Sequence, residues 1–411
     1  MMSIIASKKM VARARVPLLL AAVALVALTA SCGSSSTDTP ADNPASATIM
    51  AGPDSTVALE PITEPPAETT TIVPAPVTMS LAFAGDILIH SQVWKAAAVN
   101  AGGTGYDFTP MFARVKPLIE GVDLAICHLE VPLVTFGEKP TTNPLYSAPT
   151  EIAWAIKDMG FDRCSNASNH SFDKGVAGIE ATLGEFDAIG LGYSGMARTP
   201  DEIEPKVFDV KGIKVTHLSY TFGFNDIAAP NGETWRSALI DPARIIADAQ
   251  KARDMGANVV IVSMHWGRET QTDLSDFQLT NSDAITKSGL VDLVIGHHAH
   301  VVQKIEQVNG VWTIFGLSNL ISYLPTTNAF PDKTQDGMIV TANITLNPDA
   351  SVRVDQPVVH PTWVDKYNGV VVRPVLSDLI DPTVPDDIKA ELNVSLERTR
   401  SVVGNYFAPA P

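Results

Sequence analysis

Cysteine is scarce in this chain, with three residues among 411, and a framework of several disulfides is therefore excluded. Basic residues are also few, 29 Lys and Arg against 45 Asp and Glu, which gives a formal net charge of −16. This balance argues against a protein that holds nucleic acid or an anionic bilayer by charge, so we expect no nucleic-acid partner. An anionic substrate remains compatible with it, because a bound metal ion reverses the sign of the field inside a cleft.

The apolar run near the N-terminus is too short to span a membrane. It covers residues 17–30, whereas a spanning helix needs about 20 apolar residues. Four basic residues precede the run and small residues follow it, which is the anatomy of an export signal. Leu28–Cys32 also resembles a bacterial lipobox, in which Cys32 is lipidated. We therefore expect residues 1–32 to be a lipoprotein-type signal peptide, with ordinary cleavage and secretion as the alternative.

Residues 33–78 are predicted to be a disordered tether between this anchor and a folded domain. Positions 33–76 contain eight prolines, thirteen Ser or Thr, six acidic residues and no Lys or Arg. Such a stretch has too few large apolar groups to fold. The protein is therefore expected outside the cytoplasm, tethered to the cell membrane by lipid.

From residue 79 onward, short apolar runs alternate with amphipathic stretches, as in an α/β protein. We expect a main domain over residues 79–375 and a C-terminal helical extension over 376–411. Strands are predicted over 79–84, 122–127, 206–209, 213–220, 258–264, 291–295, 301–308, 311–315, 338–346 and 352–358. Helices are predicted over 111–119, 151–159, 177–189, 242–255, 277–288 and 386–403. This order favours a mixed sheet or two stacked sheets.

Polar side chains follow five of the predicted strands at the point where each strand ends. Functional groups of open α/β sheets collect at the carboxyl ends of strands. Histidine after a single strand is more often a hydrogen-bonded loop residue than a ligand, but five such loops at equivalent places favour one site. They contain Asp86, His128 and Glu130, Asn169 and His170, His265, and His297, His298 and His300.

Imidazole and carboxylate together suit zinc, manganese or iron. The number of candidate ligand side chains is larger than a single tetrahedral ion can bind. The sequence therefore predicts a divalent metal centre with two ions bridged by a carboxylate, a geometry suited to attack on a phosphoryl centre.

Taken together, these residues resemble the CapA family of capsule-synthesis proteins, associated with poly-γ-glutamate and placed in the calcineurin-like metallophosphoesterase superfamily. The resemblance covers residues 79–325. It implies a metallophosphatase-like four-layer α/β/β/α sandwich with metal at the carboxyl ends of the strands. It rests on six motifs in order, AGDILIH, HLEVPL, ASNHSFDKG, HWGRE, GHHAHVVQ and GLSNL.

The resemblance also implies a metal-ligand set. Asp86 and His300 are expected at the first metal, and Glu130 stands where the superfamily has its bridging carboxylate. Asn169 is expected to coordinate metal and help hold phosphate. The second metal is expected to take His265 and His298.

The catalytic roles fall on His170 and Asp173. His170 matches the residue that stabilises charge or protonates the leaving group, and Asp173 is expected to orient it through the other ring nitrogen. Arg268 and Glu269 border the expected cleft, and Asn319 stands where the family usually has asparagine in a GNF-like turn. All three are substrate-binding candidates.

Ser168 and Ala299 replace an asparagine and a proline of the family pattern, and two further departures leave alternatives open. His128 stands where the family has asparagine, so it either adds a ligand or forms hydrogen bonds elsewhere. The second histidine of the first metal has no direct counterpart, and His90 lies one helical turn too far. The site therefore holds two metals, or one firmly and one loosely. Cys127 and Cys164 lie on strands expected to be neighbours, where they form a disulfide or pack as buried thiols.

The resemblance predicts a role in making or exporting an envelope polymer, with a metal-dependent hydrolysis of phosphoester or amide bonds. Its expected partners are the polymer or its precursor, and membrane export or ligase proteins. Two alternatives remain, a non-catalytic polymer-binding subunit of an export complex and a general secreted metallophosphodiesterase. Fold alone does not decide between them.

Overall fold

The computed structural model describes residues 75–135 and 137–409. The predicted signal peptide, Cys32 and almost all of the predicted tether lie outside the described residues. Within the described part of the chain, no helix is long and apolar enough to cross a membrane.

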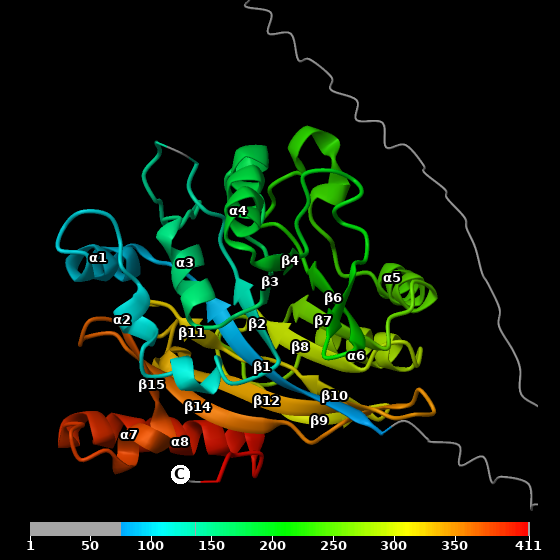
Figure 1. Cartoon of the computed structure of the whole chain (residues 1–411). Coiled ribbons are helices and arrows are strands. Elements are labelled where there is room, and N and C mark those ends of the chain that lie inside the picture. Colours follow the sequence, from blue (N-terminus) through cyan, green and yellow to red (C-terminus); the bar gives the residue numbers. More distant parts are fainter. Residues whose placement is uncertain (1–74, 136, 410–411) are drawn as a thin grey trace, which may run out of the picture. The chain divides into compact units, whose positions relative to one another are not determined.

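Two β-sheets form the centre of the domain (Figure 1). The first has nine strands and the second has six. The first contains β1 (Val77–Ile87), β2 (Leu124–Leu129), β3 (Arg163–Ser165), β4 (Gly192–Ser194), β11 (Asn319–Ile321), β12 (Asp336–Leu346), β13 (Val352–Val354), β14 (Val358–Asp365) and β15 (Val371–Pro374). The second contains β5 (Val207–Val210), β6 (Ile213–Thr221), β7 (Val259–His265), β8 (Leu293–His297), β9 (Ile305–Val308) and β10 (Val311–Ile314).

Strands β1 to β4 run parallel, and so do β6 to β8. The polar residues that follow them therefore lie at the carboxyl edge of each sheet. Strand β12 runs antiparallel between β1 and β14.

Helices surround the two sheets. They are α1 (Ser91–Asn100), α2 (Thr109–Phe112), α3 (Glu151–Asp158), α4 (Gly175–Ile189), α5 (Pro242–Asp254), α6 (Asp276–Thr286), α7 (Val375–Ile380) and α8 (Asp386–Val403). Helices α1, α2 and α3 pack on the outer face of the first sheet and α5 and α6 on that of the second. Helix α8 lies on the other face of the first sheet, where its Val403 joins the cluster between the sheets. Helix α5 begins with Pro242 after an Asp241 cap, and α6 begins with a capping box between Ser275 and Gln278, as local sequence rules predict.

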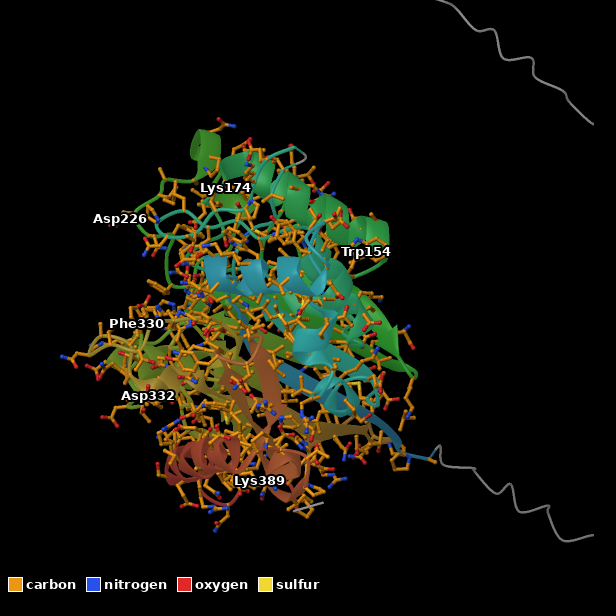
Figure 2. The ribbon with its side chains drawn as sticks, turned by 90° about the vertical axis from the view of Figure 1, so that its left-hand side faces the viewer. Trp154, Lys174, Asp226, Phe330, Asp332 and Lys389 are labelled. Atoms are coloured by element: carbon orange, nitrogen blue, oxygen red, sulfur yellow. A yellow bond between two sulfur atoms is a disulfide. The ribbon has the colours of Figure 1, made fainter. Side chains whose placement is uncertain are left out.

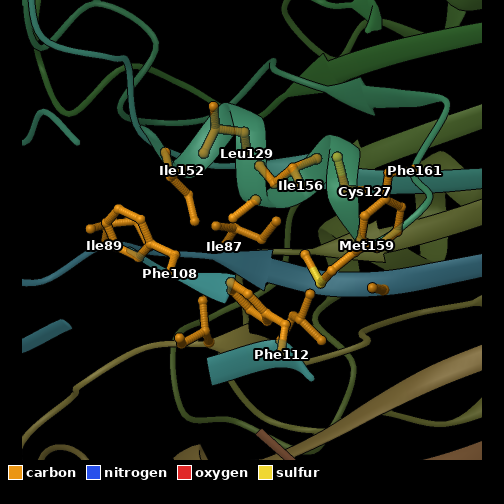
Figure 3. Close-up of a cluster of buried hydrophobic side chains, with 14 of the residues drawn as sticks. Ile87, Ile89, Phe108, Phe112, Cys127, Leu129, Ile152, Ile156, Met159 and Phe161 are labelled. Atoms are coloured by element: carbon orange, nitrogen blue, oxygen red, sulfur yellow. The ribbon is translucent and has the colours of Figure 1, made fainter. Parts of the chain in front are cut away.

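Three buried apolar clusters define four layers. One joins the first sheet to α1, α2 and α3 (Figure 3), where Ile87 and Leu129 pack against Phe112 and Ile156. The second lies between the sheets, and the third joins the second sheet to α5 and α6. The predicted α/β/β/α sandwich is confirmed.

Three predicted elements differ from the structure, two of them because of proline. The expected helix over 111–119 is broken into α2 and a short 3₁₀ turn, Lys116–Leu118. Pro117 lacks the amide hydrogen that a continuous helix needs at that point. The expected strand over 352–358 is split into β13 and β14 around Pro357, which has no amide hydrogen for the ladder. The strand expected over 301–308 forms only from Ile305.

The C-terminal helices pack on the first sheet. Helix α8 places Ile388, Leu392 and Leu396 in a buried cluster with Trp363 of β14. Figure 1 shows α7 and α8 side by side along β14.

A disulfide links neighbouring strands below the polar edge. Cys127 of β2 and Cys164 of β3 lie opposite each other, their Cα atoms are 4.4 Å apart, and the two form a disulfide. The strands that carry Glu130 and Asn169 in their following loops are thereby joined covalently.

We expect replacement of both cysteines by alanine to lower the free energy of unfolding by about 3–4 kcal/mol. The bond closes a segment with a sequence separation of 37, and this is the gain that a chain-entropy argument gives for such a loop. Urea unfolding of both proteins measures the difference. Recovery of Cys127 and Cys164 in separate thiol peptides after non-reducing digestion would contradict the pairing.

Candidate metal centre

The alternation of side chains along the strands explains why histidines meet between the sheets. On β2, Leu124 and Ile126 face the space between the sheets, and two residues later His128 faces the same way. The same period puts His265 at the end of β7 and His297 at the end of β8, directly opposite each other. The apolar layer between the sheets therefore ends in a layer of imidazoles at the carboxyl edge.

Two glycines allow the sheets to meet loops closely at this edge. A Cβ atom on Gly85, just before Asp86, would overlap the carbonyl oxygen of Ser318. A Cβ atom on Gly296, just before His297, would overlap the carbonyl oxygen of Phe315. Both positions need glycine because backbone occupies the space of a side chain.

Asp86 lies at the centre of the cluster and uses both carboxylate oxygens. Its Oδ1 is 3.0 Å from His297 Nδ1. Its Oδ2 accepts the backbone amide of His298 at 3.0 Å and lies 3.3 Å from His300 Nδ1. Burial raises the pKa of this carboxyl, but hydrogen bonds from His297 and His300 outweigh burial and hold it well below its usual value.

Glu130 is the second buried carboxylate. Its Oε1 lies 3.9 Å from His265 Nε2 and 3.6 Å from His300 Nε2. Burial raises its pKa to about 7. Burial lowers the pKa of His300, but Glu130 and Asp86 outweigh it and raise this pKa to about 10. Burial, with His300 beside it, lowers the pKa of His298 to about 3.

His298 and His300 occupy left-handed backbone positions, with φ of 86° and 53°. Residues other than glycine rarely adopt such angles, at a cost of about 1–3 kcal/mol each. The backbone turn presents both rings to the same cluster, and the amide of His298 is bonded to Asp86. Strain of this kind is typical of a functional site.

The donor set fits a divalent cation. Ligand atoms of Glu130, His265 and His298 lie within 4.8 Å of one another, and so do those of Asp86, Glu130 and His300. Among the described residues, four buried atoms of this set have no hydrogen-bond partner: both Glu130 oxygens, His265 Nδ1 and His298 Nδ1. Buried polar atoms without a partner are costly, and a cation bound by carboxylate and imidazole would satisfy the Glu130 oxygens and His298 Nδ1.

Asn169 and His170 approach the cluster from the loop after β3. Asn169 Oδ1 lies 2.8 Å from His265 Nε2. His170 Nδ1 donates to Asp173 Oδ2 at 2.7 Å, and the backbone amide of Tyr146 donates to the same oxygen at 2.7 Å. The Tyr146 ring meets the His170 ring edge-on, with centroids 4.8 Å apart. The imidazole is therefore held in one orientation.

The three substrate-binding candidates lie in different places. Glu269 is exposed at the mouth of the cluster. One of its carboxylate oxygens and ring nitrogens of His298 and His300 lie within 4.8 Å of one another. Arg268 is exposed and does not line the adjoining cavity. Asn319 is buried behind His300, accepts from its Nδ1 at 3.0 Å and donates to the carbonyl of Thr334. Its contacts indicate a residue that orients His300.

Sequence reasoning gave no role to His297 and left that of His128 open. Ligand atoms of both lie within 4.8 Å of one another and of an Asp86 oxygen, and their rings are stacked with centroids 4.2 Å apart. His128 Nδ1 bonds Ser165 Oγ at 2.8 Å. Leu293, Ile295 and His297 alternate along one strand and so face the same way, and this was the signal that could have identified His297.

His90 is outside the metal groups of the described chain. Its Nδ1 accepts the backbone amide of Tyr323 at 3.1 Å, and its ring packs against Tyr146. It does not supply the missing histidine of the first metal.

The family profile of the bacterial capsule synthesis protein PGA_cap matches residues 80–324. The chain belongs to this family. It is 29% identical over 255 residues to the PGA biosynthesis protein CapA of Bacillus subtilis (strain 168), covering 59% of this chain and 63% of that protein. It is 28% identical over 251 residues to the capsule biosynthesis protein CapA of Bacillus anthracis, covering 59% of each. The matches thus span about three fifths of these relatives.

The solved structures that are similar to this chain share less sequence identity with it. Calcineurin-like phosphoesterase YfkN from Bacillus subtilis is 14% identical with a TM-score of 0.44, covering 79% of this chain and 99% of that one. The NAD nucleotidase NadN of Haemophilus influenzae is 11% identical with a TM-score of 0.41, covering 82% of this chain and 57% of that one.

Proposed function

We propose that this PGA_cap-family protein is a metal-dependent hydrolase of phosphoester or amide bonds that acts in the synthesis or export of a capsule-type envelope polymer, of the poly-γ-glutamate kind. The observation that carries the proposal is the meeting of two buried carboxylates and three histidines beside an oriented His170. The ligands are Asp86, Glu130, Asn169, His265, His298 and His300. Export or ligase proteins of the membrane are the proposed partners.

A pair of divalent cations, manganese, iron or zinc, would polarise a phosphoryl oxygen and lower the pKa of a water there. Side chains of the protein supply the proton transfer and the contact to the substrate. Asp173 accepts the proton of His170 Nδ1, so Nε2 is the nitrogen that handles a proton at the leaving oxygen. In hydrolysis the water oxygen bonds to phosphorus, the bond to the leaving oxygen breaks, and that oxygen takes a proton. Asn169 lines the cavity beside the cluster, and its amide is the proposed contact for the phosphoryl group.

The His170–Asp173 pair favours hydrolysis over a purely binding role. Binding of a polymer needs no imidazole fixed by a buried carboxylate, whereas proton transfer does. Release of p-nitrophenol from bis-(p-nitrophenyl) phosphate, with and without added manganese, tests this. Turnover that requires metal supports the proposal, and no turnover with any of the three metals counts against it.

The proposed location is the outer face of the cell membrane, held by a lipid on Cys32. Labelling with a fatty-acid precursor is expected to mark the wild-type protein and to be lost completely in Cys32→Ala, because the thiol is the only lipidated group in this proposal. Equal labelling of both proteins would refute the anchor.

A further inference from the structure

Two cavities border the loops that follow β7 and β8. The first, of about 350 Å³, lies beside the metal cluster and is lined in part by His170, Glu269 and His300. The second, of about 200 Å³, has Thr272 and Val301 in its wall, and the rest of that wall includes the C-terminal end of helix α8. We call it the α8 cavity. The two cavities share no lining residue, so the α8 cavity is separate from the metal centre.

The two loops are bonded to each other between these cavities. The backbone amide of Thr270 donates to the carbonyl of Ala299 at 2.8 Å, and Gln303 Nε2 donates to the carbonyl of Gln271 at 2.9 Å. A group bound in the α8 cavity therefore lies against the same loop that carries His300 to the metal cluster.

Positive charge exceeds negative charge in the wall of the α8 cavity. Lys333 and Arg398 are its cationic side chains, and Asp336 is its one acidic residue. Arg398 donates from Nε and Nη2 to the two Asp336 oxygens, at 2.5 and 2.6 Å, so this pair is neutral as a unit. The ammonium of Lys333 bonds an uncharged group, Thr272 Oγ1, at 3.1 Å. In a chain with a formal net charge of −16, a cavity with surplus positive charge is a local attractor for anions.

A buried hydroxyl in the same wall has no acceptor. Thr399 is 1% exposed, and its Oγ1 has no hydrogen-bond partner in the described part of the chain. Thr182 and Thr286 are also buried in helices, but each donates to the carbonyl four residues earlier, at 2.7 and 2.6 Å. An unpaired buried hydroxyl is unfavourable, so Thr399 indicates a ligand that accepts from it. Lys333 adds further donors, because an ammonium has three protons and one is used for Thr272.

We propose that the α8 cavity binds a small oxyanion, a carboxylate or a phosphate group, between Lys333, Arg398 and Thr399. Such a group has acceptor oxygens for an ammonium, a guanidinium and a hydroxyl. The volume is below the range of clefts that hold larger organic ligands, about 300–1,000 Å³. Free phosphate and a carboxylate of an acidic polymer are the two sources of this chemistry. The anion is held outside the metal centre, so the inference does not depend on hydrolysis.

Calorimetric titration of the full-length chain with inorganic phosphate, and separately with a γ-linked pentaglutamate, tests the proposal. In Lys333→Gln the affinity for the bound anion should fall about tenfold, the size of a lost charged hydrogen bond. In Thr399→Val it should fall about threefold, because valine keeps the shape of threonine without the hydroxyl. The melting temperature of Thr399→Val should not be lower than that of the wild type, which separates a lost donor from a damaged fold.

Lys389→Gln is the matched control. Lys389 lies on the same helix, α8, near the lower edge of the molecule in Figure 2, and does not line the α8 cavity. This variant removes the same charge as Lys333→Gln and should change neither affinity. Because a metal centre also binds phosphate, each titration is repeated on Asp86→Ala, where the binding that depends on Lys333 should persist.

The two probes distinguish the sources of the anion. A fall in affinity for phosphate alone assigns the cavity to free phosphate, a fall for the peptide alone assigns it to a polymer carboxylate, and a fall for both shows that it accepts either. Equal affinities of the wild type and Lys333→Gln for both probes would overturn the proposal. Binding that disappears in Asp86→Ala would place the anion at the metal centre and overturn it as well.

Discussion

Replacement of His265 by alanine is expected to lower metal-dependent kcat/KM by about 10³-fold or more. The imidazole is completely buried at the end of β7, beside Glu130 and Asn169. A bound cation contributes several kcal/mol of charge stabilisation in the transition state, and about 4 kcal/mol corresponds to a factor of 10³. Hydrolysis of bis-(p-nitrophenyl) phosphate measures the loss.

His217→Ala is the matched control. His217 is another buried histidine of the same sheet, on neighbouring β6, but its nitrogens bond Ser263 and Arg163 and it belongs to none of the metal groups of the described chain. The control should keep bound metal and activity at temperatures where it is folded. Equal losses in both variants would show that His265 acts through folding alone.

His170→Asn is expected to lower kcat by about 10²–10⁴-fold while leaving bound metal unchanged. His170 lines the cavity and is fixed by Asp173, but it is in none of the metal groups of the described chain. Loss of a general acid has an effect of this size.

The leaving group distinguishes this role from a structural one. A nitrophenolate needs little protonation as it departs, whereas an alkoxide needs much. The loss in His170→Asn should therefore be at least tenfold larger for an alkyl phosphoester than for a nitrophenyl phosphoester. Losses of the same size for both esters would remove His170 from the role of acid, and loss of metal in the variant would make it a ligand.

The predicted strands and layers follow from local patterns. Apolar runs such as Val259–Met264 are buried on both faces, so their composition alone identifies them. Two of the errors occurred where proline interrupted an apolar pattern, at Pro117 and Pro357, because the pattern records burial and not backbone hydrogen bonds.

The six expected ligand side chains converge because parallel strands end at a common edge. Their order in the chain was enough to place them near one another. The environment of each side chain was not predictable, because it depends on partners from distant segments. Asn319, for example, lies behind His300, and this follows from the parallel pairing of β11 with β1.

The wall of the cavity beside the metal cluster was the least predictable part. Tyr146, Asn225 and Phe330 come from three loops that have neither a periodic pattern nor a motif. Their approach depends on loop conformations such as the left-handed backbone of Asn225, with φ of 50°. Loop residues brought together in this way carry no joint signal in sequence.

The metal content of the full-length chain tests the central claim most directly. Elemental analysis of protein purified without added metal, beside Asp86→Ala, His298→Ala and the His217→Ala control, measures equivalents per chain. The account predicts one to two equivalents of manganese, iron or zinc in the wild type and the control, and loss in the other two variants. A chain that binds no metal even after reconstitution would contradict it.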